Sequence, residues 1–310
     1  MGRLRRHPRG HRRLGAGGGA HARAARARAE TRLTAVALAV TSAALFGGMT
    51  VLVRMGFTRE PDAALATAAT VSVALAVAVV AALVDGPHDV LAAWPFLLAG
   101  LLAPGLSQLF FTFAIRTVGA SRTSVVVGAA PLAAVAVAFI VLDEPVSAPL
   151  VVGALLIVGG GVALVVERRP DHLRASGLVL AGICTLLFAA RDNLVRHLSG
   201  TSAVPPTVAA AATLAVGAVV ATAYARRLPG RAALGVFAPA GLCFGLSYVC
   251  LFEAYYRGRV SVVSPLVATE TLWGVGLSAL LLRRTELVGG RLVAGAALIV
   301  LGGVLIGVYR

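Results

Sequence analysis

Long stretches of uncharged, apolar residues recur along the whole chain and constrain its fold more than any other feature. Only 13% of the 310 residues are charged, whereas 58% are hydrophobic, and the mean hydropathy is +0.89. A soluble domain carries about a quarter charged residues, because its surface must stay wet. Each stretch is close to the roughly 20 residues that a helix needs to cross a bilayer. The sequence therefore excludes an ordinary soluble enzyme, a disordered chain and a disulfide scaffold, and it predicts a polytopic membrane protein.

The apolar stretches predict an all-α protein with about ten transmembrane helices. We expect the first five helices at 33–53, 63–84, 93–115, 123–142 and 145–166, and the second five at 175–197, 204–225, 232–256, 260–282 and 292–309. The connectors between them are short and rich in charged residues, proline and glycine, and none could hold a soluble domain. Any chemistry must therefore take place within the membrane or at its edge. The predicted organisation is a basic disordered tail at 1–32 and two five-helix units at 33–166 and 175–309.

The positive charge is concentrated at the N-terminus. The net charge is +15, all 28 basic residues are Arg, and ten of these Arg lie within residues 1–32. Such a tail can bind nucleic acid or anionic lipid. We expect instead a solvated tail, or a stretch upstream of the true start, and no nucleic-acid partner. By the positive-inside rule the tail places the N-terminus in the cytoplasm, although the loops of a ten-helix layout then carry thirteen Arg outside and five inside.

The two halves of the apolar region repeat one another. A shift of 142 residues superimposes Val53 on Val195, Glu144 on Glu286, Gly153 on Gly295 and Gly160 on Gly302. In the middle of each half a shift of 140 superimposes Ala114 on Ala254, Ser121 on Ser261 and Ser124 on Ser264. Because five helices per half is an odd number, the second half must enter the membrane with the opposite orientation. The sequence predicts an inverted repeat, which many secondary transporters use to build two gates around one central site.

Several of these residues resemble a known family. Gly119-Ala120-Ser121, Pro131, Leu142-Asp143-Glu144-Pro145 and the glycine-rich segment 153–161 look like the end of an EamA domain. The second half resembles the same unit through Ser261, Ser264-Pro265, Glu286 and the segment 295–303. On these residues the chain resembles an EamA-type transporter of the drug/metabolite transporter superfamily over about 33–309. One departure is that Thr271 stands where the first half has Pro131, with Glu270 before it where a small residue is usual.

The resemblance implies a secondary transporter of the cell (inner) membrane with both termini in the cytoplasm. It also implies alternating access around a cavity lined by the first, third, fourth, sixth, eighth and ninth helices.

Three acidic residues lie inside apolar stretches, all in the second half: Asp192, Glu253 and Glu270. A charge at the centre of a membrane helix costs about 2.5–3.5 kcal/mol on insertion scales, so such groups usually face a partner or a wet cavity. Glu270 lies near the middle of the predicted ninth helix. We expect it to bind a cationic group of a substrate or to couple transport to protons. The alternative is a hydrogen-bonded Glu that only locks helix packing.

Further polar and aromatic residues could contact the same substrate. Arg191, Asp192 and Asn193 form a charged cluster in which Arg191 could clamp a carboxylate, or which could simply lie at the membrane interface. Weaker candidates, each with a packing role as the alternative, are Glu253 and Tyr256 near the end of the eighth helix, Gln108 in the third and Trp273 one turn after Glu270.

The sequence contains no motif of a catalytic, phosphate-binding or metal-binding site. Cys184, Cys243 and Cys250 lie inside apolar stretches without metal-ligand spacing. We therefore expect no enzyme activity, cofactor or metal. The expected function is an exporter or permease for a small organic metabolite or drug-like solute, with or without proton coupling. The alternative is a membrane scaffold or sensor with the same fold. The expected partners are a small-molecule substrate and the lipid bilayer, and a homodimer is left open.

Overall fold

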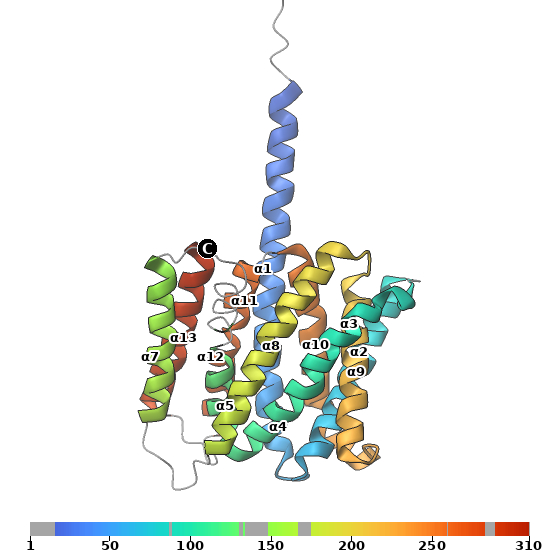
Figure 1. Ribbon diagram of the computed structural model, residues 1–310, viewed down its shortest axis with the longest axis vertical. Helices are drawn as coiled ribbons and strands as arrows, with labels where there is room; N and C mark the ends of the chain where they lie inside the picture. Colours follow the sequence, from blue (N-terminus) through green and yellow to red (C-terminus); the bar gives the residue numbers. More distant parts are fainter. Residues whose placement is uncertain are drawn as a thin grey trace, which may run out of the picture.

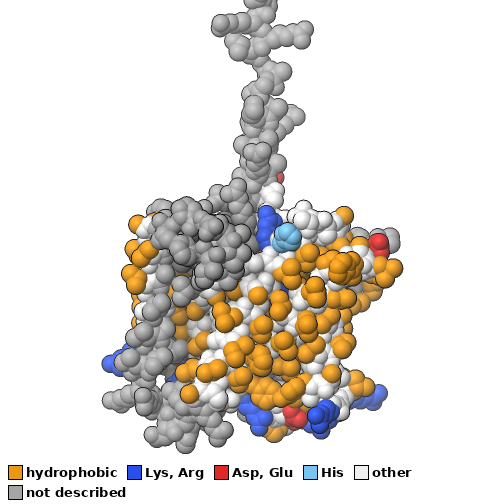
Figure 2. Space-filling view, in the orientation of Figure 1, with side chains coloured by type: hydrophobic (Ala, Val, Ile, Leu, Met, Phe, Trp, Pro, Cys, Tyr) orange, Lys and Arg blue, Asp and Glu red, His pale blue; other side chains and the backbone are white. Residues whose placement is uncertain are grey.

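The protein is an all-α, multi-pass membrane protein. The computed structural model describes residues 16–86, 89–129, 133, 148–166, 175–258, 260–282 and 289–309, and within these ranges every regular element is a helix. Six of the described helices are long and apolar enough to cross a membrane: Leu33–Gly56, Ala63–Asp85, Val90–Val118, Ala175–Thr201, Pro206–Ala225 and Arg231–Arg257. Hydrophobic side chains cover the middle of the visible surface, and charged side chains gather toward its two ends (Figure 2).

The helices follow one another with short connections (Figure 1). The first unit contains α1 (Ala16–Gly56), α2 (Ala63–Asp85), η1 (Val90–Ala93), α3 (Trp94–Gly100), η2 (Leu101–Leu106), α4 (Ser107–Val118), α5 (Ala120–Val127) and α7 (Ala148–Val166). The second unit contains α8 (Ala175–Thr201), α9 (Pro206–Ala225), α10 (Arg231–Arg257), α11 (Val260–Val267), α12 (Glu270–Leu281) and α13 (Gly290–Tyr309). Most of the predicted helix at 123–142 lies outside the described residues, as do Pro131, Glu144 and Glu286, so the count of ten helices stays a prediction.

The basic segment differs from the expectation of a disordered tail. Helix α1 begins at Ala16 and continues without a break to Gly56, over 41 residues. Ala and Arg are both favourable helix formers, so an Ala/Arg-rich segment continues the membrane helix outward. Figure 1 shows this helix extending well beyond the rest of the bundle. The prediction was therefore wrong for 16–32, while 1–15 lie outside the described residues.

Two of the predicted continuous helices are interrupted. The third breaks inside η2, where Ala103 adopts an extended conformation (φ −148°, ψ 123°) before Pro104. Proline lacks an N–H and disfavours a helical conformation in the residue that precedes it. The ninth stretch is two helices, because α11 ends at Val267 and α12 begins at Glu270. There the Thr269 hydroxyl donates to the carbonyl of Leu266 at 2.6 Å, a local bond that competes with the helix ladder.

The second interruption has a counterpart in the first half. Helix α5 covers Ala120–Val127 and is followed by a turn at 128–129, while α11 covers Val260–Val267 and is followed by a turn at 268–269. Both the helices and the turns are offset by 140 residues, the same offset that matches Ser124 to Ser264. The two halves thus share a backbone feature that apolar composition alone would not produce.

Helices from different halves pack against one another. The pairs are α1 with α10, α2 with α9, α4 with α8, and α7 with α13. In the α1–α10 pair, the hydroxyls of Ser42 and Ser247 each donate to the backbone carbonyl of the other residue at 2.9 Å, within buried surroundings. Figure 1 shows α7 and α13 side by side at one edge of the bundle, with α2 and α9 toward the opposite edge.

Glycines allow close approach between α7 and α13. A Cβ atom added at Gly160 would lie 2.6 Å from the carbonyl oxygen of Gly295, and one added at Gly302 would lie 2.5 Å from that of Gly153. Because a shift of 142 residues maps Gly153 on Gly295 and Gly160 on Gly302, these are equivalent contacts seen from the two halves. The small residues let the two backbones meet directly, as is common for helices packed in lipid.

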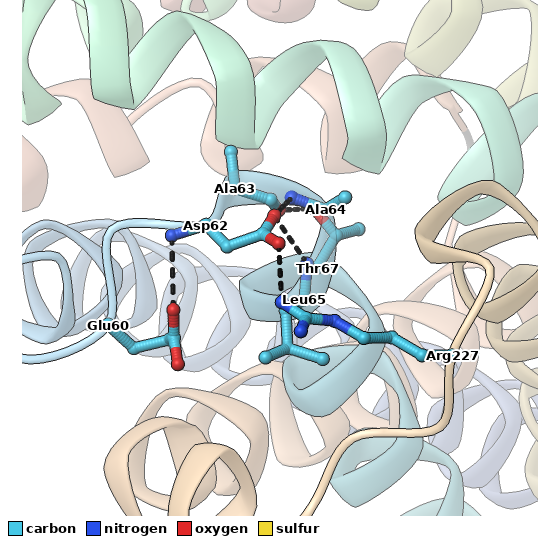
Figure 3. Close-up of polar contacts among 7 residues, drawn as sticks. All are labelled: Glu60, Asp62, Ala63, Ala64, Leu65, Thr67 and Arg227. Atoms are coloured by element: carbon cyan, nitrogen blue, oxygen red, sulfur yellow. Dashed lines mark hydrogen bonds and ion pairs between the residues drawn. The ribbon is translucent and has the colours of Figure 1, made fainter.

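An ion pair joins two loops at one end of the bundle (Figure 3). Asp62 precedes α2, accepts from the backbone N–H groups of Ala64 (2.9 Å) and Leu65 (3.2 Å), and lies 2.8 Å from the guanidinium of Arg227. Arg227 follows Arg226, whose left-handed conformation (φ 55°) ends α9. Partial burial acts to raise the pKa of Asp62, but the hydrogen bonds from Leu65, Arg227 and Ala64 outweigh it and hold this pKa below its usual value.

A second contact lies at the other end of the same two helices. The Thr207 hydroxyl in α9 donates to the Asp85 carboxylate at the end of α2, at 2.9 Å. Helices α2 and α9 are therefore antiparallel and tied at both ends. The loop between α1 and α2 lies on the same side of the bundle as the loop between α9 and α10.

Candidate functional site

A small cavity lies where α1, α8, α10, α11 and α12 meet. It is lined by Ser42, Phe46, Val127, Phe188, Ala189, Arg191, Asp192, Ser247, Tyr248, Leu251, Ser264, Val267, Ala268 and Glu270. About 40 Å³ of it is open to the centre of a water molecule. One water needs roughly 10–15 Å³ by this measure, so in this conformation the cavity has room for a few waters. Three ionisable side chains contribute to its wall: Arg191, Asp192 and Glu270.

Arg191 and Asp192 form a buried ion pair within α8. The Nε atom of Arg191 and the Oδ1 atom of Asp192 are 2.8 Å apart. Their relative orientation is not that of a hydrogen bond, and among the described residues neither atom has a hydrogen-bond partner, nor has Nη1 of Arg191. A buried polar atom normally finds a partner, because leaving it unpaired costs about 1–3 kcal/mol. The pair thus keeps hydrogen-bonding capacity at the wall of the cavity.

Aromatic rings hold the guanidinium of Arg191 in place. Its Cζ atom lies 4.9 Å from the ring centroid of Tyr248 in α10 and 5.6 Å from that of Phe188 one turn earlier in α8. Phe188 in turn meets Phe46 of α1 edge-on at 5.8 Å. A cation beside an aromatic face is stabilised by about 0.5–2 kcal/mol, more when water is excluded. The charge of Arg191 is therefore stabilised from two helices.

Glu270 reaches the cavity because the ninth stretch is broken. It is the first residue of α12 and only 7% exposed. A carboxylate in the first turn is favoured by the positive end of the helix dipole. Within the described part of the chain, no hydrogen bond to its side chain is observed, while it interacts electrostatically with Asp192 and Arg191. The break thus places a carboxylate, rather than the middle of a continuous helix, against the cavity.

Close packing fixes the position of this helix start. A Cβ atom added at Gly47 of α1 would lie 2.7 Å from Cβ of Trp273 and 2.8 Å from the backbone nitrogen of Gly274. On the other side, the Thr271 hydroxyl donates to the carbonyl of Ser124 in α5 at 3.1 Å. Helix α12 is therefore held between α1 and α5, directly beside Glu270.

Hydroxyl groups supply the remaining polar surface near the cavity. The hydroxyl of Tyr255 in α10 lies 3.2 Å from that of Ser264 in α11, and it is also close enough to Asp192 to interact with its carboxylate. The Ser42–Ser247 contact forms another part of the wall. These groups can donate or accept, so the cavity offers both kinds of hydrogen bond besides its three charges.

The structure brings together three of the eight predicted site residues, namely Arg191, Asp192 and Glu270. The other five lie outside this cavity. Asn193 is exposed and donates to the carbonyl of Ala189 in its own helix at 2.9 Å, and Glu253 pairs with Arg257 one turn later. Gln108 is buried with its Nε2 3.9 Å from Sδ of Met49, Trp273 is 43% exposed, and Tyr256 is half-buried.

Sequence reasoning missed several residues of the cavity wall, chiefly Tyr248, Ser42 and Ser247. A signal for two of them was present, because the shift of 140 superimposes Ser247-Tyr248 on Ser107-Gln108. Only the Gln of that set of four was singled out, since it is the more polar. No sequence signal distinguishes Ser42, whose importance comes from the partner that the fold brings to it.

The described residues contain no group of three or more His, Cys, Asp or Glu side chains that could hold a metal ion.

Comparison with known proteins gives a family and a fold. Residues 33–166 match the family model described as the EamA-like transporter family. A solved structure described as "Crystal structure of protein" is 21% identical, with a TM-score of 0.64 over 88% of this chain and 96% of that one. At this identity the likeness supports the fold alone. No curated protein matches the chain.

Proposed function

We propose a transport function on the premise that, through residues 33–166, the chain belongs to the EamA-like transporter family. The protein is a secondary transporter that moves a small organic metabolite or drug-like solute across the cell (inner) membrane by alternating access. Its N- and C-termini lie in the cytoplasm. The substrate occupies an expanded form of the cavity between α1, α8, α10 and α12.

The observation that carries this proposal is the convergence of Arg191, Asp192 and Glu270 on one cavity. All three are more than nine-tenths buried in a membrane protein, where ionisable groups are costly and usually mark a substrate or ion pathway. They come from two different helices, and atoms of the Arg191–Asp192 pair have unused hydrogen-bonding capacity. A packing role would be served better by apolar residues of similar volume.

The internal symmetry supports alternating access. The matched breaks after α5 and α11, the equivalent glycine contacts between α7 and α13, and the pairing of the α1–α2 loop with the α9–α10 loop all fit an inverted repeat of five helices. In such a repeat, two similar halves can rock around a site at their interface. The cavity lies at that interface, because α1 belongs to one half and α8, α10 and α12 to the other.

The charges favour a substrate that carries an amine. With all three groups ionised the site has one positive and two negative charges. A substrate ammonium can pair with Glu270, and its aromatic or aliphatic part can contact Phe46 and Tyr248. Arg191 can hold a carboxylate in bidentate fashion if the substrate has one.

The first experiment is a thermal-shift screen of the purified protein against amino acids, polyamines, nucleosides, sugars and quaternary ammonium compounds. A ligand at 100 times its Kd stabilises the folded state by about 2.7 kcal/mol. We expect one amine-bearing class to raise the Tm, and we expect Glu270→Gln to abolish this response. Glu253→Gln is the matched control, because it removes a carboxylate that lies outside the cavity and should leave the response intact.

Transport itself is measured in proteoliposomes with the ligand class from the screen. A pH gradient should drive accumulation in the wild type, and Glu270→Gln should lose accumulation if Glu270 carries the proton. If Glu270→Gln leaves both the ligand response and the pH dependence unchanged, Glu270 does not have the central role. A protein that binds ligand but moves none would be a sensor or scaffold with the same fold.

A further inference from the structure

A second, larger hollow lies at the end of the bundle where α1 and α12 finish. Its volume is about 770 Å³, and it lies between the last turn of α1 with the following loop, the first part of α10 and the end of α12. These helix ends mark the boundary between the hydrocarbon core and the polar surface of the membrane. The hollow is therefore at headgroup level, and it is separate from the cavity that holds Glu270.

The polar part of this groove is cationic. Arg54 and Arg59 are the charged residues among the described lining, and Thr58 adds a hydroxyl. The Nη1 atom of Arg54 lies 3.4 Å from the carbonyl oxygens of both Ile115 and Arg116, which hold this guanidinium near the end of α4. Arg59 is exposed, and its backbone N–H donates to the carbonyl of Gly56 at 2.9 Å. Two fixed positive charges thus meet at one rim.

The remainder of the groove is apolar and partly open to the surroundings. Leu52, Met55 and Leu281 form part of its lining, and Met55 and Leu281 are 41% and 53% exposed. Its floor is ordered, because the ring of Phe57 meets that of Phe237 edge-on at 6.2 Å. At this depth such exposed apolar side chains face acyl chains. The groove therefore presents positive charge at headgroup level and apolar surface just below it.

We propose that this groove binds an anionic phospholipid of the surrounding leaflet. The phosphate and headgroup lie against Arg59, Arg54 and Thr58, and an acyl chain lies along Met55, Leu52 and Leu281. Basic pockets at the ends of membrane helices bind anionic headgroups in this way, and each Arg near the surface contributes on the order of fivefold in affinity. The lipid touches α1, α10 and α12, the helices that also frame the central cavity, so its binding stabilises their present arrangement.

The test uses the full-length protein in a neutral detergent, with phosphatidylglycerol and phosphatidylcholine of identical acyl chains as probes. The readouts are the Tm and the lipid retained in native mass spectrometry. We expect phosphatidylglycerol to raise the Tm more than phosphatidylcholine does and to be retained preferentially. In Arg59→Gln the apparent affinity for phosphatidylglycerol should fall about fivefold, and it should fall further when Arg54→Gln is added.

Arg231→Gln is the matched control. Arg231 begins α10 at the same end of the bundle and is exposed, but it does not line the groove. Equal losses in Arg59→Gln and Arg231→Gln would show diffuse surface attraction and overturn the proposal, as would equal responses of the wild type to both lipids. Glycerol phosphate tests the headgroup alone. If it stabilises the protein as well as the lipid does, the groove is a site for a soluble anion instead.

Discussion

Arg191 and Asp192 are neighbours in α8, both buried, and their charged atoms approach to 2.8 Å. Removing one member of a buried pair leaves an uncompensated charge and costs about 3–5 kcal/mol, whereas replacing both by neutral groups can be almost neutral. We therefore expect Arg191→Met to lower the unfolding free energy strongly. The double variant Arg191→Met/Asp192→Asn should recover most of this loss. Chemical unfolding of the four proteins in detergent gives the coupling energy, and additive effects would show that the two charges act independently.

Asp62 combines a helix cap with an ion pair, and two substitutions separate these roles. Asn is as good an N-cap residue as Asp, whereas Ala at this position costs about 0.5–2 kcal/mol. The partly exposed pair with Arg227 contributes only about 0.2–1 kcal/mol. We expect Asp62→Ala to lower the Tm clearly and Asp62→Asn to lower it slightly. A larger loss in Asp62→Asn than in Arg227→Gln would mean that the cap depends on the charge.

The same residue gives a pH dependence with a definite sign. Because the pKa of Asp62 is lower in the folded state than in the unfolded state, its contribution to stability is complete above the unfolded pKa, about 3.9. The contribution is lost as the pH falls through the folded pKa. The Tm difference between wild type and Asp62→Asn should therefore be constant from pH 7 to about pH 5 and should shrink below pH 4. A difference that grows in acid would contradict this assignment.

Single residues were predictable where chemistry singles them out and not where geometry does. Glu270, Asp192 and Arg191 were identified because a charge in an apolar stretch is conspicuous. Gln108 and Trp273 were equally conspicuous, but a helix has a face that the sequence does not reveal when every face is apolar. Their side chains lie outside the cavity for that reason.

At the scale of the helix, the contact between α1 and α12 fixes the mouth of the cavity, and two adjacent glycines test it. A Cβ atom at Gly47 would lie 2.8 Å from the backbone of Gly274, so Gly47→Ala must push the helices apart at an expected cost of about 1–3 kcal/mol. At Gly48 the nearest atom is Sγ of Cys243 at 4.0 Å, which leaves room for a methyl group. We expect Gly47→Ala to lower the Tm and weaken ligand binding, while Gly48→Ala does neither. Equal effects would place the tight contact elsewhere.

Helix positions followed from hydropathy, but helix breaks did not. The bounds of α2, α9 and α10 lie within about two residues of the expectation, because the end of an apolar stretch is a composition change. The turn at 268–269 lies between apolar neighbours and leaves no such change. The internal repeat was the better signal, because its offset of 140 residues is reproduced by the backbone of α5 and α11.

The orientation of the whole molecule gives the largest-scale prediction. The Asp62–Arg227 pair fixes the α1–α2 and α9–α10 loops on one side, and the Asp85–Thr207 contact fixes the start of α9 on the other. On a background in which Cys184, Cys243 and Cys250 are replaced, we expect Thr58→Cys and Leu228→Cys to react with an impermeant maleimide from outside the cell. Ser202→Cys should react only after permeabilisation. The reverse pattern would place the N-terminus outside and overturn the orientation drawn from the Arg-rich segment.

For the whole molecule, the sequence predicted the class and the family resemblance but not the shape. Low charge content was enough to specify an all-α membrane protein. It gave no sign that α1 would remain a single rod through residues 16–32, because disorder and helix are both compatible with an Ala/Arg-rich segment.

That rod makes α1 a lever. Between Gly47, where α1 is gripped by α12, and Ala16 there are about 46 Å of helix, at roughly 1.5 Å per residue. A tilt of 10° about the gripped point would displace the far end by about 8 Å, as long as the rod stays rigid. A change of only a few degrees deep in the bilayer is thereby magnified into a displacement in water, where a spectroscopic ruler can follow it one molecule at a time.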